Sequence, residues 1–423
     1  MRSRRRLGFL IALILGAAAV GALAPASASA RARGNVRVLA LIPTPGFPAF
    51  PLVIGHHIFE GTYDNPTGDH VPSRVFEYSG GGELLESWTV QGQNLNQPHG
   101  VQVANRDARR RLLLLDKTSG RILRLNPRTG VQALYSRVPD LPACSSTPAG
   151  KPCSPATQDL APMPDYAAWG PDGSLYVTDY QQAVIWRIPP GGGKARIWLA
   201  DPRLDGNMFG TACILTMPDH HTLLFDQASN GGAMGGGNPT TGKLYKVAIR
   251  ANGHPGPLHQ LWESGPADAP DGCMLSRSGH IYIALAGASN QIVELSSKGK
   301  ELGRFGQQFS GTNNSKVPYD TPSGLAWLGS DLILANQAFL DQNTANMALL
   351  NIAAGEQGVP TYLPARAGLK RVHHQRRPSD SGKGTPPARG RGHRGGHRSR
   401  RHAHHHRHHH PSKRPRRSRG FTG

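Results

Sequence analysis

A pair of β-strands recurs six times along the 423-residue chain, and each pair consists of two apolar strands joined by a Gly-rich or charged turn. Period-2 alternation on either side of such a turn is typical of a β-hairpin. A short β run precedes every hairpin, and an inner-strand candidate precedes each of those runs, so that each unit has four strands. The hairpins begin with RVFEYSGGG at Arg74, GRILRLNPRTG at Gly120, AVIWRIPPGGG at Ala183, GKLYKVAI at Gly242, QIVELSSKG at Gln291 and ALLNIAAGEQG at Ala348.

Six such units, each of roughly 40 to 60 residues and with almost no helical periodicity, predict an all-β protein with a six-bladed β-propeller. We expect the propeller to occupy residues 35–363. The segment VRVLALIP at Val36–Pro43 lies outside the six units. We therefore predict that it completes the sixth blade and closes the ring.

The N-terminus has the pattern of a secretory signal peptide over residues 1–30. Arg2, Arg4, Arg5 and Arg6 precede an apolar run from Leu7 to Leu23, and Ala-x-Ala sites follow. This run is too short and wrongly flanked for a stable membrane anchor, and no other long apolar run exists. We expect a secreted, soluble mature protein without a transmembrane span, exported by either the general or the twin-arginine route.

The positive charge of the chain is concentrated at its C-terminus. Residues 366–423 hold 18 Lys or Arg and one acid, a net charge of +17, whereas residues 31–365 are neutral. The segment 364–423 has almost no apolar residues, so we predict a disordered Arg/His-rich tail. Three roles stay open for this tail. It binds an anionic cell-wall polymer through its charge, it binds a transition metal through HAHHHRHHH, or it has no partner and only aids solubility. No aromatic residues are interleaved to stack on bases, so specific nucleic-acid binding is not indicated.

Four cysteines fit a secreted context. Cys144 and Cys153 bracket a Ser/Thr/Pro/Gly loop that buries little, and we expect them to be bonded. Cys213 and Cys273 occupy similar places on the inner strands of adjacent units. They are either close enough to bond or are buried free thiols that pack as small apolar groups.

Residues just before the inner strands of a propeller converge at one mouth of the channel, despite their distance in the sequence. In this chain they are His99, Asp165, Thr211 or Ala212, Asp271 and Ser323. Two carboxylates and an imidazole around one axis can hold a hard divalent cation or act as acid and base. Pro-Asp-Gly and Pro-His-Gly are also good turn sequences, so a purely structural role stays open. Glu60, Asp179 and Asp226 end second strands, and we interpret them as turn caps.

Two segments resemble blades of the gluconolactonase and regucalcin-like propellers: PDYAAWGPDGSLYVTDYQQAVIWRI from Pro164 and PDGCMLSRSGHIYIALAGASNQIVELSSKGKEL from Pro270. PHGVQV at Pro98 is similar to blades of the related NHL-repeat propellers. The resemblance implies one divalent cation, with calcium favoured, held at the channel mouth by a Glu, Asn residues and an Asp. By position, Asp271 matches the Asp, and His99 falls where the Glu is expected. Asp165 falls where one Asn is usual, and Thr211 or Ala212 falls where a second Asn is usual. Asn207, just upstream of Thr211, is a substitute ligand.

Two functions follow from this reading, both for a monomer that uses the channel mouth: binding of a small ligand with or without its hydrolysis, or non-catalytic binding of a peptide or polysaccharide. In the first, a cation bound by Asp165 and Asp271 polarises a lactone or ester carbonyl, and His99 acts as the base on water. In the second, the same mouth is a non-catalytic binding scaffold that the basic tail holds near an anionic surface. A bound metal distinguishes the two, because only the hydrolase requires one.

Overall fold

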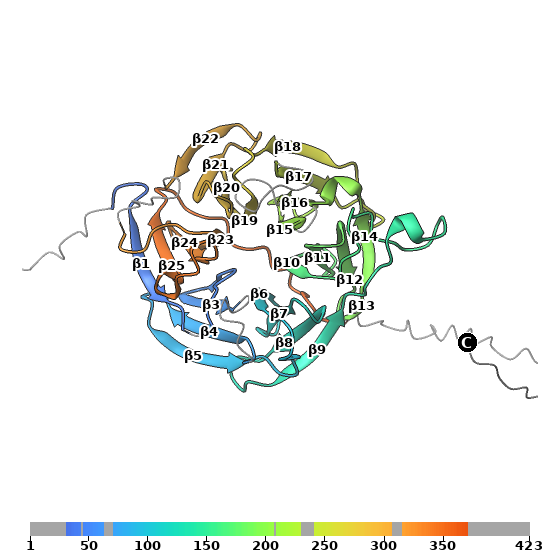
Figure 1. Ribbon diagram of the computed structural model, residues 1–423, viewed down its shortest axis with the longest axis horizontal. Helices are drawn as coiled ribbons and strands as arrows, with labels where there is room; N and C mark the ends of the chain where they lie inside the picture. Colours follow the sequence, from blue (N-terminus) through green and yellow to red (C-terminus); the bar gives the residue numbers. More distant parts are fainter. Residues whose placement is uncertain are drawn as a thin grey trace, which may run out of the picture. The chain divides into compact units, whose positions relative to one another are not determined.

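Six sheets surround a central channel in the computed structural model, which describes residues 31–43, 45–62, 71–206, 209–229, 241–306 and 315–370 (Figure 1). This part of the chain contains strands and a few short 3-10 turns, which confirms the all-β, six-bladed propeller. The predicted signal peptide and most of the predicted tail lie outside the described residues. Within the described residues, no helix is long and apolar enough to cross a membrane.

Each of the first three blades is a sheet whose strands follow one another outward from the channel, and a two-residue strand from blade 3 is added to blade 2. Blade 1 contains β2 (Leu52–Ile54), β3 (His57–Gly61), β4 (Arg74–Ser79) and β5 (Leu84–Thr89). Blade 2 contains β6 (Val101–Arg106), β7 (Leu112–Asp116), β8 (Arg121–Leu125), β9 (Gln132–Arg137) and the added β13 (Gly193–Lys194). Blade 3 contains β10 (Pro164–Trp169), β11 (Leu175–Asp179), β12 (Val184–Ile188) and β14 (Arg196–Ala200).

The last three blades repeat this order, except that the outer strand of the sixth comes from the other end of the chain. Blade 4 contains β15 (Thr211–Thr216), β16 (Thr222–Gln227), β17 (Lys243–Ala248) and β18 (His259–Glu263). Blade 5 contains β19 (Pro270–Leu275), β20 (Ile281–Leu285), β21 (Gln291–Leu295) and β22 (Glu301–Phe305). Blade 6 contains β23 (Pro322–Leu328), β24 (Asp331–Asn336), β25 (Ala348–Ala353) and β1 (Val36–Leu41).

The N-terminal strand β1 closes the ring, as the sequence predicts. It pairs antiparallel with β25, with Val36 opposite Ile352 and Leu41 opposite Ala348. Arg31, just before β1, forms an ion pair of 2.8 Å with Asp331 at the start of β24. The pairing covers an edge of β25 that would otherwise present unpaired backbone groups.

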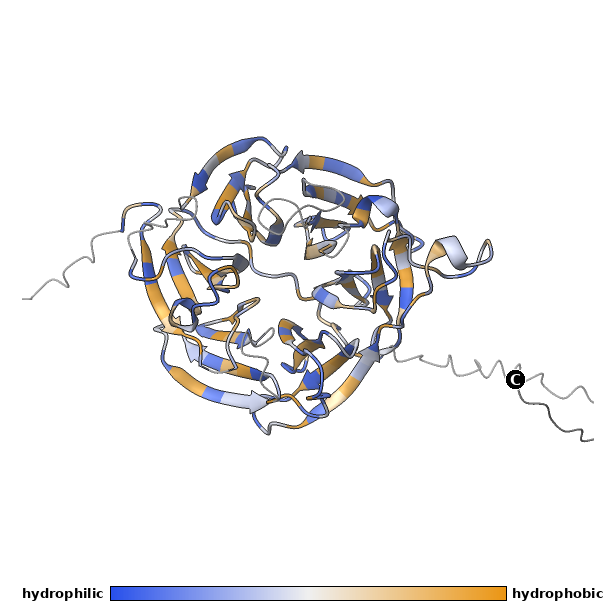
Figure 2. Ribbon diagram, in the orientation of Figure 1, coloured by the Kyte–Doolittle hydropathy of each residue, from blue (hydrophilic) through white to orange (hydrophobic). Residues whose placement is uncertain are grey.

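Burial falls from the second strand of each blade to the fourth, and this explains the apolar runs in the sequence. Every residue of β7, β11 and β20 is buried, because neighbouring blades pack against both faces of these strands. The outer strand β5 is mostly exposed. Figure 2 shows the same gradient, with more blue in the outer strands. The stable inner framework therefore holds the ends of the inner strands in fixed positions around the channel.

The segment after β25 crosses the far end of the channel, and Figure 1 shows it as an orange-red line through the centre of the ring. We call residues Gln357–Leu363 the strap. The Arg277 N–H donates to the Gln357 carbonyl at 2.8 Å, and the Val359 N–H donates to the Leu275 carbonyl at 2.9 Å. The Tyr362 ring stacks on His220 with 4.1 Å between the ring centroids. The strap thus joins blade 5 to blade 4 and covers one end of the channel.

Both cysteine pairs form disulfides. Cys144 and Cys153 close the loop before blade 3, which confirms the expected bond. Cys213 on β15 and Cys273 on β19 are also bonded, with 5.7 Å between their Cα atoms. The sequence left open whether these two cysteines are bonded or are free thiols, and the structure shows them bonded. The disulfide joins the inner strands of blades 4 and 5.

Candidate functional site

The open end of the channel contains a cavity of about 320 Å³ to which all six blades contribute. Antiparallel pairing places the start of each inner strand beside the end of the second strand, so side chains from both positions meet there. The residues from the inner-strand starts are Gln102, Asp165, Asp271 and Ser323. The residues that directly follow second strands are Lys117, Tyr180, Ala286 and Gln337.

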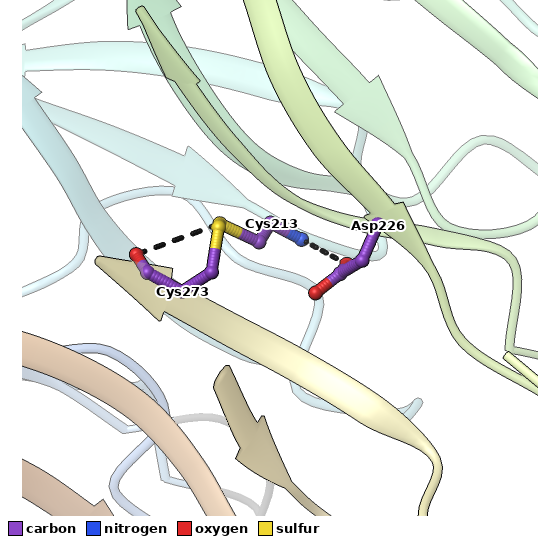
Figure 3. A group of neighbouring side chains, drawn as sticks. All are labelled: Cys213, Asp226 and Cys273. Atoms are coloured by element: carbon purple, nitrogen blue, oxygen red, sulfur yellow. Dashed lines mark hydrogen bonds between the residues drawn. A yellow bond between two sulfur atoms is a disulfide. The ribbon is translucent and has the colours of Figure 1, made fainter. Parts of the chain in front are cut away.

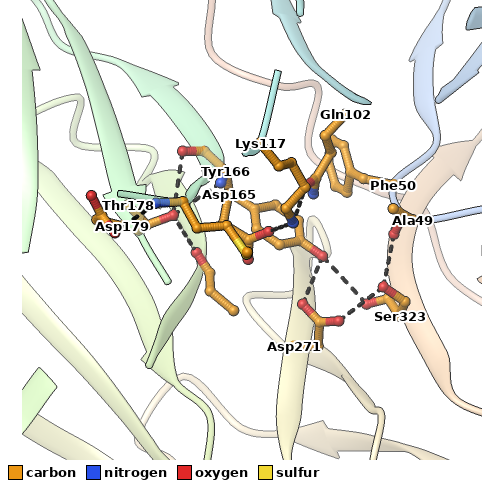
Figure 4. A network of polar contacts seen from close by, with 12 residues as sticks. Ala49, Phe50, Gln102, Lys117, Asp165, Tyr166, Thr178, Asp179, Asp271 and Ser323 are labelled. Atoms are coloured by element: carbon orange, nitrogen blue, oxygen red, sulfur yellow. Dashed lines mark hydrogen bonds and ion pairs between the residues drawn. The ribbon is translucent and has the colours of Figure 1, made fainter. Parts of the chain in front are cut away.

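A buried ion pair between Lys117 and Asp165 lies on one side of the cavity (Figure 4). Their exposed fractions are 3% and 2%. The Lys117 ammonium also donates to Gln102 Oε1 at 3.1 Å and lies 5.5 Å from the centroid of the Tyr180 ring. Burial raises the pKa of Asp165, and the adjacent ammonium opposes that rise. Blade 2 therefore supplies a positive charge that is held against a carboxylate of blade 3.

Asp271 lies on another side of the cavity and is held by two hydroxyl groups. Its Oδ1 accepts from the Tyr166 hydroxyl at 2.9 Å, and its Oδ2 is 2.8 Å from Ser323 Oγ. Ser323 Oγ is also 2.9 Å from the Ala49 carbonyl, which can only accept. A hydroxyl has one proton, so Ser323 satisfies Ala49 only if Asp271 is protonated and donates to Ser323. Burial raises the pKa of Asp271 to about 7, with the Asp165 charge adding to the effect.

Asp226 lies next to the disulfide between blades 4 and 5 (Figure 3). Its Oδ1 accepts from the Cys213 N–H at 2.9 Å, and its Oδ2 has no hydrogen-bond partner in the described part of the chain. Burial and the nearby Asp271 raise the pKa of Asp226 well above its usual value. The two sulfur atoms are bonded to each other, so they are not thiolate ligands. This cluster is a buried carboxyl group beside a cystine, and not a metal site in the oxidised protein.

The residues at the mouth do not fit a divalent cation. Calcium takes six to eight oxygen ligands, usually with several carboxylates. Here Asp165 already faces the Lys117 ammonium, and both Asp271 oxygens contact hydroxyl groups. A divalent ion bound by Asp165 would lie close to a like charge in a buried site, which is costly. The Lys117 ammonium therefore supplies the positive charge beside Asp165 that a metal ion would supply.

Another group with metal-ligand atoms within 4.8 Å of one another comprises His280, Glu294 and Glu356. Its members already have partners: Arg33 pairs with Glu294, and Ser278 and Tyr282 donate to Glu356. This group is a hydrogen-bonded network between blade 5 and the residue before the strap.

The structure places the other residues of the predicted site away from the pair of aspartates. The His99 ring nitrogens lie next to the backbone carbonyls of Gln97 and Val71, and His99 does not line the cavity. The Thr211 hydroxyl donates to the Leu204 carbonyl at 3.3 Å and is fully buried. Asn207 lies outside the described residues. Asp165 and Asp271 are therefore the two predicted ligands that the structure brings to the cavity.

Strand register explains the position of His99. Pro164 pairs with Asp179 in blade 3, and Val101 pairs with Asp116 in blade 2. The residue of blade 2 equivalent to Asp165 is therefore Gln102, three positions after His99. Matching Pro98-His99-Gly100 to Pro164-Asp165 misplaces the start of β6 by three residues.

Sequence reasoning missed Lys117, which is the only cation that lines the cavity among the described residues. A usable signal was present: in four blades the residue directly after the second strand lines the cavity, and in blade 2 that residue is the Lys of Leu-Asp-Lys.

No protein-family model matches the chain, and no curated protein matches it. Among solved structures, regucalcin from Agrobacterium tumefaciens, a calcium-binding protein, is 16% identical with a TM-score of 0.51, over 79% of this chain and 99% of that chain. Luciferin-regenerating enzyme is 10% identical with a TM-score of 0.48, over 75% of this chain and 95% of that one. Virginiamycin B lyase from Staphylococcus aureus is 14% identical with a TM-score of 0.43, over 71% and 81%.

The likeness to regucalcin concerns the fold. The protein shares the six-bladed β-propeller fold of regucalcin, which is the fold that the resemblance in the sequence implies.

Proposed function

We propose that this propeller is exported and binds a small, uncharged, polar molecule at the open channel mouth without a resident metal. The observation that carries the proposal is the cavity of about 320 Å³ lined by the Lys117–Asp165 pair and by Asp271. Its volume is in the range of small-molecule sites, and it combines apolar walls with a few convergent polar groups.

Charge balance favours an uncharged ligand. The Lys117 and Asp165 charges compensate each other, and Asp271 is neutral below pH 7 because burial raises its pKa to about 7. Among the described lining residues, no other ionised group at neutral pH remains to bind an ion. Hydroxyl or carbonyl groups of a ligand match the donors and acceptors at the mouth.

Aromatic side chains favour a cyclic ligand with an apolar face. Tyr180 and Phe209 lie together, with 5.4 Å between their ring centroids, and Phe339 lines the cavity as well. Rings of this kind provide flat apolar surface beside the polar groups. Sugars and sugar lactones combine hydroxyl groups with such a face, so we assign the ligand to this chemical class.

A catalytic version of this proposal rests on Asp271. A carboxyl group with a pKa near 7 that lines a ligand cavity is suited to general acid–base chemistry near neutral pH. In lactone hydrolysis, Asp271 removes a proton from water, the resulting hydroxide adds to the ring carbonyl, and the proton passes to the departing ring oxygen. The product is the open hydroxy acid, and the step requires water as its only co-reactant.

Binding and hydrolysis are tested together with a panel of hexoses and glucono-1,5-lactone, by calorimetry and by the acid released from the lactone. We expect saturable 1:1 binding that Asp271→Asn weakens at least tenfold, with Asp140→Asn as a control at an exposed carboxylate. Acid release that depends on Asp271 identifies a hydrolase, whereas binding without it identifies a scaffold. If no member of the panel binds, the assigned ligand class is wrong.

A calcium titration tests the competing metal site that the sequence predicts. Calcium prefers oxygen ligands, so the imidazoles of the histidine-rich segment interfere little. One tightly bound Ca²⁺ that Asp271→Asn removes would replace our proposal with a calcium site. Export is tested by expressing the whole chain in a bacterial host and locating the processed protein outside the cytoplasm.

A further inference from the structure

A second cavity, of about 430 Å³, lies at the end of the channel opposite the open mouth. Its walls come from the ends of the inner strands, whereas the walls of the mouth come from their starts. The strap forms the remaining wall. The principal contributors are Leu52, Arg106, Met274, Trp327 and the strap residues Gln357–Thr361.

The charge of this cavity differs from that of the mouth. Among the described residues that line it, Arg106 and Arg277 are the charged ones, and none is acidic. The rest of the lining is largely apolar, with Asn105, Gln357 and Thr361 as polar members. Two like charges beside apolar walls create a local positive potential that attracts an anion.

The acid next to Arg106 and the acid next to the strap are both paired with other groups. Asp107, next to Arg106, forms ion pairs with Arg111 and Arg124. Glu356, the residue before the strap, contacts His280 and accepts from Ser278 and Tyr282. Within the described ranges, neither Arg106 nor Arg277 forms a salt bridge.

Trp327 supplies a flat apolar wall under the strap. Gly358 lies against its ring so closely that a Cβ atom at Gly358 would be 1.9 Å from Trp327 Cγ. The indole nitrogen is buried and has no acceptor in the part of the chain that the structure describes. Trp327 lines the cavity, so a ligand bound there would change the environment of its indole ring.

We propose that this cavity is a second binding site, which takes a small amphipathic anion: an apolar body with one carboxylate group. The guanidinium fork of Arg matches a carboxylate with two parallel hydrogen bonds. The apolar walls bury the body of the ligand. The two ends of the channel then select different molecules, an uncharged polar one at the mouth and an amphipathic acid beneath the strap.

Octanoate and 1-octanol are matched probes, because they share an alkyl chain and differ in the charged head group. Both are titrated by calorimetry into the full chain and into three variants: Arg106→Gln, Arg277→Gln and Arg128→Gln. Arg128 is exposed on the turn between β8 and β9 and does not line the cavity, so it is the control. Tryptophan fluorescence of the wild type and of Trp327→Phe is recorded in parallel.

We expect one octanoate per chain, at least tenfold weaker binding of octanol, and at least tenfold weaker octanoate binding in each cavity variant but not in Arg128→Gln. Octanoate should change the tryptophan fluorescence of the wild type, and this change should be lost in Trp327→Phe. The proposal is overturned if octanoate does not bind, if octanol binds equally well, or if all three arginine variants bind octanoate like the wild type. The last outcome would assign the binding to the basic C-terminal segment, which all the variants share.

Discussion

Asp271 is expected to make the stability of the protein depend on pH. Its pKa is about 7 in the folded protein and 3.8 in an ordinary environment, so between these values the folded state holds a proton that the unfolded chain has lost. Stability from this group is therefore fully present below about pH 4 and falls as the pH rises to 7. The full difference corresponds to about 4 kcal/mol as an upper bound.

Asp271→Asn removes this titration while keeping a donor toward Ser323, since the amide NH₂ replaces the carboxyl proton. We expect the free energy of unfolding of the variant, measured with urea, to fall less than that of the wild type between pH 5 and 7. Asp140→Asn, at an exposed carboxylate, serves as the control and should follow the wild type. Parallel curves for the wild type and Asp271→Asn would show that Asp271 is ionised throughout this range.

The contributions of Lys117 and Asp165 to the free energy of unfolding are expected to depend on each other. Lys117→Met leaves the buried Asp165 carboxylate without its cation, and breaking a buried pair from one side typically costs about 3–5 kcal/mol. The double variant Lys117→Met/Asp165→Asn removes both charges and should recover part of that loss. The measurement is the free energy of unfolding of all four proteins in a double-mutant cycle. Additive losses would mean that the pair contributes no coupling energy.

Individual site residues were predictable only where the sequence repeat and the strand register agree. Asp165 and Asp271 follow a Pro at the start of an inner strand, and both reach the cavity. His99 also follows a Pro, yet β6 begins later than that pattern suggests. Turn sequences mark where the chain bends, but the pairing partner of each residue decides which side chain faces the channel. Asp179 fits its interpretation as a turn cap, because it accepts from the Gln181 and Gln182 N–H groups.

At the scale of elements, the hairpins and the closing strand were predictable because turn chemistry and apolar alternation are local properties. Register was harder, because bulges shift it. In β10 and β19 the register against the second strand shifts directly after the first residue of the strand. In β6 the register shifts between Val103 and Asn105. The difference moves equivalent positions apart in the sequence while the blades keep the same shape. Contacts between segments that are distant in the sequence, such as the disulfide between β15 and β19, depend on how the blades pack.

The Cys213–Cys273 disulfide is expected to stabilise the contact between blades 4 and 5. It closes a loop of 60 residues, which corresponds to about 4 kcal/mol in the chain-entropy model. Cys213→Ala/Cys273→Ala should lower the free energy of unfolding in urea by about 2–4 kcal/mol. It should also remove most of the effect of a reducing agent on the stability of the wild type.

Cys144→Ala/Cys153→Ala is the matched comparison, since that bridge closes only nine residues in a mostly exposed loop. Its loss should be smaller, because a short loop gains less from closure. An equal loss in the two variants would show that the effect of the inner bridge does not come from the long loop that it closes.

The whole molecule combines a neutral ring with a strongly basic end. The described chain stays packed beyond the predicted propeller boundary: Ala367 is fully buried, and its carbonyl accepts from the Ala108 N–H at 3.0 Å. Residues 371–423 then hold 16 Lys or Arg and one acid. A truncation meant to remove the basic segment without disturbing the strap should therefore end at Lys370.

We predict that residues 371–423 carry the affinity of the protein for polyanions such as anionic cell-wall polymers. The full chain should be retained on a heparin column and elute at high salt, because screening shortens the reach of exposed charges to about 8 Å at physiological ionic strength. The protein truncated after Lys370 should pass through at low salt. Lowering the pH from 8 to 6 should raise the eluting salt concentration of the full chain, since the segment holds eleven His residues that gain charge there. Equal retention of both proteins would place the anion-binding surface on the propeller instead and leave the basic segment a solubilising role.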